Sequence, residues 1–323
     1  MRKIRYDITT EYEGMKISRF LQLKGYSEKN LTVLRGRDET IYLNGRPVHM
    51  NETICQGDAI EVYIPEEEEA TAVVPVNIPI DVVYEDEDII VINKPANMPI
   101  HPSRMHQDNS LANALAYYYN KDLDDKDAVD NKFVFRCINR LDRDTTGLTI
   151  VAKHMVSAAI LYNEMKRRDI RRTYYAIVEE TPDNRLTDSG TIDAPIGRVD
   201  GIEDVKMAED GRGLNSGTRG ITRGVDFEKG QPAVTHYEVI DRVGDLALVQ
   251  LKLETGRTHQ IRVHMSYIGH PLIGDNIYNP RNSIMDRQAL HAGELEFMHP
   301  ITGEKLIIKA DIPEDMRRVL NNN

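Results

Sequence analysis

An acidic, proline-containing segment divides this sequence into two parts of unequal length. Residues 66–69 are four consecutive glutamates, and Pro75 and Pro79 follow without a regular apolar pattern. Like charges repel and proline restricts the backbone, so such a segment is typical of an extended, solvated linker. We therefore expect the 323-residue chain to fold as a small unit (1–65), a linker (66–79) and a larger unit (80–323).

The composition excludes several classes of protein. Hydrophobic residues make up 40% of the chain and charged residues 29%, which is typical of a globular protein with a packed core. We find neither an apolar run of the length of a membrane span nor an apolar stretch of the kind found in secretory signals near Met1. Cys55 and Cys137 are too few for a disulfide framework or a cysteine zinc site, so the sequence predicts a cytoplasmic protein.

The overall net charge of −11 argues against nucleic acid as a partner, but its distribution does not. Residues 66–130 alone carry a net charge of −11, while residues 1–65 carry +1 and residues 131–323 carry −1. Because a nucleic-acid surface needs a local basic patch rather than a basic average, both flanking parts are compatible with RNA binding.

The small unit has the pattern of two helices followed by a hairpin and a strand. Apolar spacing predicts a helix over residues 17–23, and Ser27 is a suitable N-cap for a second helix that runs to about residue 37. Asn44-Gly45 predicts a hairpin turn after a strand at 40–43, and a further strand is expected at 59–64. The helical part carries basic residues that are consistent either with phosphate binding or with a solvated face: Arg19, Lys24, Lys29, Arg35 and Arg37.

In the order of these features, residues 1–65 resemble the S4 RNA-binding domain. The matching parts are the first helix, the helix that begins at Ser27, the segment 42–48 with its Asn-Gly turn, and the Gly-Asp strand at 57–62. The resemblance implies that this unit docks on structured RNA, without indicating which sequence it would read.

The larger unit alternates strands and helices in no strict βαβ order. We find no phosphate-binding loop, no dinucleotide-binding glycine pattern and no internal repeat. Strands are predicted at 88–93, 148–152, 173–179, 235–240 and 246–253, and helices at 110–119, 155–167 and 258–268.

Two short segments concentrate the groups that could carry chemistry. Residues 140–148 place two arginines and two aspartates between strand-like runs, and positive neighbours favour the ionised carboxylate that a nucleophile or base requires. Residues 255–264 hold two arginines and two histidines next to a predicted helix start. Tyr174, within a predicted strand, could stack on a base or belong to the core.

The histidines also raise the question of a metal site. His259, His264, His270 and Asp275 could supply ligands, but their spacing matches no known zinc pattern and no cysteine supplements them. A metal site is therefore not expected.

Taken together, residues 80–312 resemble the RluA family of pseudouridine synthases, which modify uridines in ribosomal or transfer RNA. The blocks R-L-D-x-x-T-T-G and T-G-R-T-H-Q-I-R are the most specific. The resemblance implies an α+β fold with a mixed, largely antiparallel central sheet and flanking helices, preceded by the small S4-like α/β domain. The matching blocks are 88–95 with 101–102, 140–148, 172–176, 255–265 with 269–278, and 290–292.

The resemblance also assigns roles to residues. Asp142 takes the place of the family's catalytic aspartate, Tyr174 would stack on the uracil and serve in the final proton step, and Arg262 would pair with Asp142. Further contacts with the substrate are expected from Arg140, Arg257, Lys94 and Thr146.

The chemistry agrees with these residue types. Isomerisation of uridine breaks an N–C glycosidic bond and rejoins the ring through carbon, so no metal, redox cofactor or nucleotide is expected. An ionised carboxylate could attack the substrate covalently or abstract a sugar proton, and the sequence does not choose between the two routes. The target base must leave its stack at a cost of a few kcal/mol, and Arg140 would help to displace it.

Two features depart from the family. Asn139 stands where a histidine usually precedes R-L-D, and we expect activity to survive because the aspartate is present. Residues 207–230 form a longer, glycine- and arginine-containing insertion that could contact RNA or simply lie at the surface.

The sequence thus predicts a cofactor-independent RNA isomerase, with 23S ribosomal RNA as the first expected substrate and transfer RNA as an alternative. A catalytically silent RNA-binding or ribosome-assembly protein of the same fold is the competing interpretation. A metal-dependent hydrolase is a third. No obligate protein partner is predicted.

Overall fold

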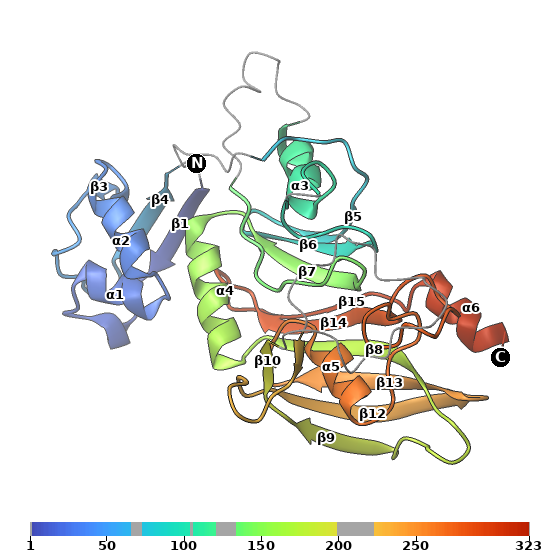
Figure 1. Cartoon of the computed structure of the whole chain (residues 1–323). Helices are drawn as coiled ribbons and strands as arrows, with labels where there is room; N and C mark the ends of the chain where they lie inside the picture. Colours follow the sequence, from blue (N-terminus) through green and yellow to red (C-terminus); the bar gives the residue numbers. More distant parts are fainter. Residues whose placement is uncertain (1, 66–72, 104–105, 121–133, 199–222, 323) are drawn as a thin grey trace.

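The computed structural model describes residues 2–65, 73–103, 106–120, 134–198 and 223–322 (Figure 1). These residues form a four-stranded sheet near the N-terminus, a nine-stranded sheet and a two-stranded sheet. The predicted linker falls partly outside the described residues, and the predicted insertion falls largely outside them. Among the described helices, none combines the length and hydropathy that a membrane-spanning segment requires.

The N-terminal sheet is antiparallel, with the strand order β1-β4-β2-β3. Its hairpin turns at Asn44 and Gly45, which both have positive φ, as the Asn-Gly dipeptide predicts. Strand β1 is not evident in the sequence because Ile4 is its only buried residue. The elements are β1 (Arg2–Asp7), the 3-10 helix η1 (Thr10–Tyr12), α1 (Ile17–Leu23), α2 (Glu28–Arg35), β2 (Ile41–Leu43), β3 (Arg46–Pro47) and β4 (Ala59–Ile64).

Helix α2 begins with a reciprocal cap that also ties it to the rest of the molecule. Ser27 Oγ accepts from Asn30 N at 3.2 Å, and Asn30 Oδ1 accepts from Ser27 N at 3.0 Å. The amide group of Asn30 has a donor left, which it gives to the Met155 carbonyl at 3.3 Å. Asparagine therefore serves here where a capping box normally has Glu or Gln.

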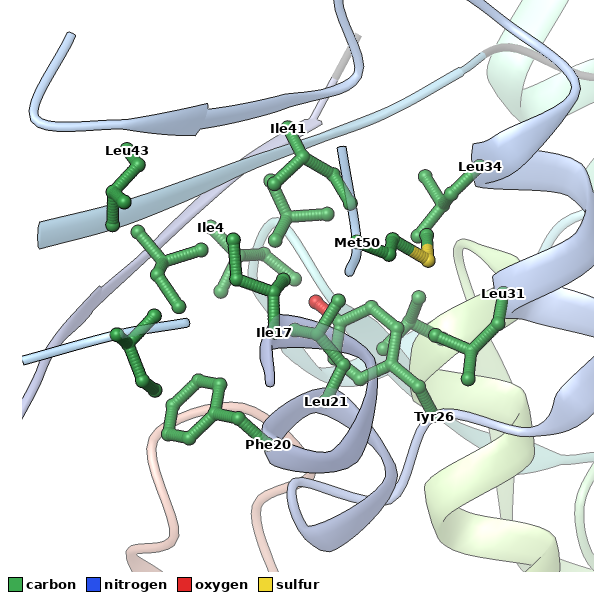
Figure 2. Close-up of a cluster of buried hydrophobic side chains, with 14 of the residues drawn as sticks. Ile4, Ile17, Phe20, Leu21, Tyr26, Leu31, Leu34, Ile41, Leu43 and Met50 are labelled. Atoms are coloured by element: carbon green, nitrogen blue, oxygen red, sulfur yellow. The ribbon is translucent and has the colours of Figure 1, made fainter. Parts of the chain in front are cut away.

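The N-terminal unit packs directly on helix α4 (Met155–Arg167). Its apolar core gathers side chains from α1, α2 and the small sheet (Figure 2), and Val156 of α4 is fully buried in the same cluster. A Cβ atom at Gly25 would lie 2.7 Å from Ile160 Cγ1, so the two parts touch closely at this point. The Arg2 guanidinium adds a two-bonded pair with Asp88, at 2.8 and 3.0 Å.

The large sheet has the strand order β5-β6-β7-β14-β8-β13-β12-β9, and β15 also pairs with β14. All neighbours are antiparallel except β7 and β14, so the predicted mixed, largely antiparallel sheet is confirmed. Its strands are β5 (Asp81–Glu85), β6 (Ile89–Lys94), β7 (Thr146–Ala152), β8 (Arg171–Glu179), β9 (Ser189–Asp193), β12 (Val234–Val243), β13 (Leu246–Leu253), β14 (Leu290–Met298) and β15 (Lys305–Lys309).

Helices flank this sheet, and a short ribbon lies beside helix α5 (Figure 1). Strands β5, β9, β14 and β15 and the C-terminal helix have no counterpart among the predicted elements. The remaining elements are α3 (Leu111–Asn120), α5 (Gln260–Tyr267), α6 (Glu314–Asn322), and the ribbon strands β10 (Ile196–Arg198) and β11 (Arg223–Val225).

The parallel pair β7–β14 sets the position of the segment that carries Asp142. Gly147 lies opposite Ala292, directly after the 140–145 loop. It has a φ of 112°, and a Cβ atom there would overlap the backbone of Ala292. Only glycine fits this position, because both the backbone conformation and the close strand contact exclude a side chain.

We expect Gly147→Ala to lower the free energy of unfolding by about 3 kcal/mol or more, because steric overlap adds to backbone strain. Gly303→Ala is the matched control, since Gly303 also has positive φ (71°) but no atom lies within 4 Å of the added Cβ. Its expected loss is about 1 kcal/mol, from strain alone. Equal losses in urea denaturation would contradict the role given to the β7–β14 contact.

Candidate active site

A buried lysine holds the loop that precedes β7. Lys94 Nζ donates to the carbonyl oxygens of Pro95 (2.7 Å), Met98 (3.0 Å) and Arg143 (2.9 Å). Because the last of these belongs to the 140–145 loop, the ammonium group ties that loop to the end of β6. Burial lowers the pKa of Lys94 to about 7, while nearby carboxylates oppose this by favouring the charged form.

A single buried guanidinium connects two carboxylates at the centre of the site. Arg262, on α5, donates through Nε and Nη2 to Asp275 at 2.7 and 2.8 Å, and through Nη1 to Asp142 Oδ2 at 3.1 Å. The predicted contact between Arg262 and Asp142 is therefore present. Asp275 is fully buried, whereas the side chain of Asp142 is 27% exposed, so only Asp142 is accessible from outside.

The environment favours the charged forms of the buried pair. Burial alone would lower the pKa of Arg262, but the bonds to Asp275 and Asp142 outweigh it, and the pKa lies above its usual value. Burial would raise the pKa of Asp275, yet its bonds from Arg262 and from the backbone of Ile277 and Tyr278 keep it below the usual value. A buried ion pair needs this degree of hydrogen bonding to offset its desolvation.

Tyr174 lies beside Asp142, on strand β8. Its hydroxyl is buried, which raises the pKa of Tyr174, and the guanidinium of Arg172 partly opposes that rise. Arg172 Nη1 also lies against Gly256, at 3.2 Å from where a Cβ atom would be, while its buried Nε has no partner among the described residues. Arg172 therefore stands between the buried phenol and the 255–260 loop.

Asp142, Tyr174 and Arg262 line a small pocket with a volume of about 60 Å³. Its walls come from the 140–145 loop, strand β8, the 255–260 loop and the first turn of α5. Arg140 is exposed, and Arg257 is fixed to Gln231 Oε1 at 2.8 Å and to the Pro232 carbonyl at 3.1 Å. The predicted site residues that line the pocket are Arg140, Asp142, Tyr174, Arg257 and Arg262.

Lys94 and Thr146 do not line this pocket, and their expected contact with the substrate stays a prediction. Both border a separate cleft of about 770 Å³ that also contacts strand β5 and the segment before α6. Lys94 is fully buried and directs its ammonium group at three carbonyls, and Thr146 Oγ1 bonds to His291 Nδ1 at 2.9 Å. The three bonds of Lys94 hold the backbone of the 140–145 loop against the segment that follows β6.

The basic residues of the N-terminal unit lie on or next to α1 and α2. Arg19, Lys29 and Arg35 are exposed, and Arg37 is half-buried. Lys24 Nζ lies 4.7 Å from the centre of the Tyr12 ring. None of the five residues lines the pocket.

The histidines that could have formed a metal site have other partners. His264 bonds to Thr235 and to the Ala194 carbonyl at 2.9 Å each, and His270 bonds to the Glu179 carbonyl at 3.1 Å. Among the described residues, ligating side chains converge only at Asp86, Asp88 and His299. There, Arg2 and His154 already occupy the Asp88 carboxylate.

Asn139 is buried and serves the backbone of β7. Its amide donates to the Leu148 carbonyl at 2.9 Å, and its Oδ1 accepts from Ile150 N at 2.8 Å. Asn139 therefore anchors the start of the 140–145 loop to the sheet by hydrogen bonds.

A family model described as RNA pseudouridylate synthase matches residues 88–267. YlyB of Bacillus subtilis strain 168, named an uncharacterized RNA pseudouridine synthase, is 38% identical over all of this chain and 98% of its own length. The chain belongs to the RNA pseudouridine synthase family. It is an enzyme that acts on RNA, and the predicted RluA-family resemblance is confirmed.

Two further relatives of this pseudouridine synthase agree. Ribosomal large subunit pseudouridine synthase D of Escherichia coli K12 is 37% identical, over 86% of this chain and 81% of its own. The solved structure of human RNA pseudouridylate synthase domain containing 1 has 27% identity and a TM-score of 0.53, over 72% of this chain and 83% of its own. The catalytic fold is thus shared with known members of the family.

Three residues of this site have no role assigned from the sequence. Asp275 and His259 are candidate metal ligands there and lie in matching blocks, as does Arg172. A buried arginine needs partners for its charge, and carboxylates are the most common ones. Charge pairing could have identified Asp275, whereas the positions of His259 and Arg172 depend on tertiary contacts.

We expect Asp275→Asn to lower the free energy of unfolding by about 3 kcal/mol and to reduce pseudouridine formation, because it leaves Arg262 buried without its main counter-charge. Asp315→Asn is the matched control: Asp315 pairs with Arg287 in the same two-bonded geometry, at 2.7 and 2.8 Å, but its side chain is 48% exposed. The control is expected to lose about 1 kcal/mol or less. A smaller loss for Asp275→Asn than for the control would show that the buried pair is not structurally important.

Proposed function

We propose that this pseudouridine synthase isomerises uridines of 23S ribosomal RNA, with Asp142 as the catalytic carboxylate. The observation that carries the proposal is the position of Asp142: it faces a pocket, it is held by a buried arginine, and it lies beside a buried tyrosine. Among the described residues, no donor is bonded to its Oδ1 atom. That oxygen is therefore available for the reaction.

The reaction balances without a co-reactant. The bond between uracil N1 and sugar C1′ breaks, a bond between uracil C5 and C1′ forms, and the proton on C5 is replaced by one on N1. Asp142 starts the reaction either as a nucleophile or by abstracting a sugar proton. Tyr174 then stacks on the detached uracil, and its hydroxyl relays the C5 proton: it takes that proton, directly or through water, while it passes its own proton to water. Both steps require a base that has left its RNA stack.

The three arginines of the pocket have separate roles in this proposal. Arg262 positions Asp142, and Arg257, at the pocket wall, is suited to a phosphate of the RNA backbone. Arg140 is exposed at the pocket and can fill the space that the flipped base leaves in the RNA. Water exclusion by the bound RNA would protect the cleaved intermediate.

The N-terminal unit is proposed to be an S4-like RNA-binding domain over residues 1–65, joined by residues 66–79 to a catalytic domain over residues 80–323. Its own core and the exposed basic residues on α1 and α2 support this division. Arg19, Lys24, Lys29, Arg35 and Arg37 would contact phosphates. Ribosomal RNA is favoured as substrate because the Escherichia coli relative is named for the large ribosomal subunit.

We expect the enzyme to release tritium from a 23S ribosomal RNA transcript labelled at uracil C5, because bond formation at C5 expels that hydrogen. Asp142→Asn is expected to lower the rate at least about 1,000-fold, since the amide can neither attack nor accept a proton. The control variant Asp241→Asn changes an exposed residue of β12 and is expected to match the wild type.

A labelled transfer RNA pool tests the substrate in parallel. Release from transfer RNA alone would contradict the proposed substrate, and equal release by Asp142→Asn and wild type would contradict the catalytic role. No release from either RNA by the wild type would favour a binding or assembly function.

A further inference from the structure

His259 lies in the pocket without a part in the mechanism described above. It precedes α5 and has a φ of 59°, the left-handed conformation that a non-glycine residue adopts only at a cost. Its Nε2 atom lies 3.9 Å from Asp142 Oδ2, too far for a hydrogen bond but near enough to share a ligand. Backbone strain that aims a side chain at a catalytic group is common at functional sites.

The hydrogen bonds around His259 determine which ring nitrogen carries the proton. Tyr278 donates its hydroxyl proton to the Arg223 carbonyl at 3.1 Å, so that oxygen can only accept from His259 Nδ1, which lies 3.1 Å away. The neutral ring therefore has its proton on Nδ1 and a lone pair on Nε2. Nε2 faces Asp142 as a hydrogen-bond acceptor.

The surroundings favour this neutral ring near pH 7. Burial lowers the pKa of His259, and the positive charges of Arg262 and Arg223 act in the same direction. The carboxylates of Asp142 and Asp275 raise the pKa of His259, but the lowering effects are larger together. Asp142 in its ionised form has no proton to donate to His259 Nε2. The hydrogen-bond donor for this nitrogen is therefore expected from the substrate.

A uridine inside an RNA chain has only two hydrogen-bond donors, the sugar 2′-hydroxyl and the base N3–H. The 2′-hydroxyl is attached to the carbon next to C1′, the atom at which the glycosidic bond breaks. If Asp142 acts at the sugar, one of the routes that the proposed function allows, an acceptor 3.9 Å from its carboxylate is within reach of that hydroxyl. The N3–H lies on the far side of the uracil ring from the sugar.

We propose that His259 Nε2 accepts a hydrogen bond from the 2′-hydroxyl of the target uridine. This inference rests on the proposed function of Asp142. His259 is then a substrate-binding residue that orients the ribose against Asp142 and makes the site selective for RNA over DNA. A deoxyribose would leave the Nε2 lone pair unpaired in a half-buried pocket, which weakens binding of the transition state.

The test compares two enzymes on two substrates, so that the effect of the variant and the effect of the substrate change can be separated. Tritium release in single turnover is compared for wild type and His259→Gly, each with uridine or 2′-deoxyuridine at the modified position of a 23S transcript. Glycine removes the imidazole and accepts the left-handed backbone without strain, so the fold is preserved. We expect the deoxy substitution to slow the wild type about tenfold more than it slows His259→Gly, the value of one hydrogen bond.

Two controls make the result specific. His236→Ala removes a histidine of β12 whose side chain is 44% exposed and bonds to Thr191 and Glu254. This variant should be slowed by the deoxy substitution as much as the wild type is. N3-methyluridine at the same position tests the other donor. The inference would be overturned if the deoxy substitution slowed wild type and His259→Gly equally. It would also be overturned if the two enzymes differed in their response to N3-methylation instead. Absence of release by the wild type from the unmodified transcript would instead refute the proposed function.

Discussion

The guanidinium of Arg262 bridges two carboxylates, and the geometry of the active site depends on this bridge. The side chain is 4% exposed, so its charge must be compensated within the protein. Asp275 supplies a fully buried, two-bonded partner, which leaves the third donor nitrogen directed at Asp142. One oxygen of Asp142 is thereby fixed while the other stays available. The same guanidinium thus holds a fully buried carboxylate and a partly exposed one.

The loop that carries Asp142 is secured on its other sides by the sheet. Lys94 ties it to the end of β6 through three carbonyls, and Asn139 ties its start to β7. At Gly147 the chain passes directly against β14, where no side chain fits. Together with the bond from Arg262 to Asp142, four constraints therefore act on a segment of fewer than ten residues, as a preorganised site requires.

The sequence predicts the elements whose pattern is local. Helices α1 and α4 follow their apolar spacing, and the first hairpin follows Asn44-Gly45. Strand β14 escapes prediction because Gly293 and alternating glutamates interrupt its apolar run, yet it lies in the middle of the sheet between β7 and β8. The order of strands depends on contacts between distant residues, which no local pattern records.

The site likewise combines residues that the sequence predicts with residues whose positions depend on tertiary contacts. Through the family resemblance, the R-L-D block, the tyrosine strand and the T-G-R-T-H-Q-I-R block predict Asp142, Tyr174 and Arg262 as neighbours, and the structure brings them together. For Lys94, only the tertiary structure shows that three carbonyls surround its ammonium group. Its expected contact with the substrate stays a prediction.

The most direct test of the bridge is the rate of tritium release by Arg262→Lys under single-turnover conditions, with circular dichroism to confirm the fold. Lysine keeps the positive charge but cannot span two carboxylates with a planar fork. We expect the rate to fall by roughly 100-fold, the effect of displacing a catalytic group by about 1 Å. A folded variant with a rate near that of the wild type would show that charge alone suffices, and that the bridge does not position Asp142.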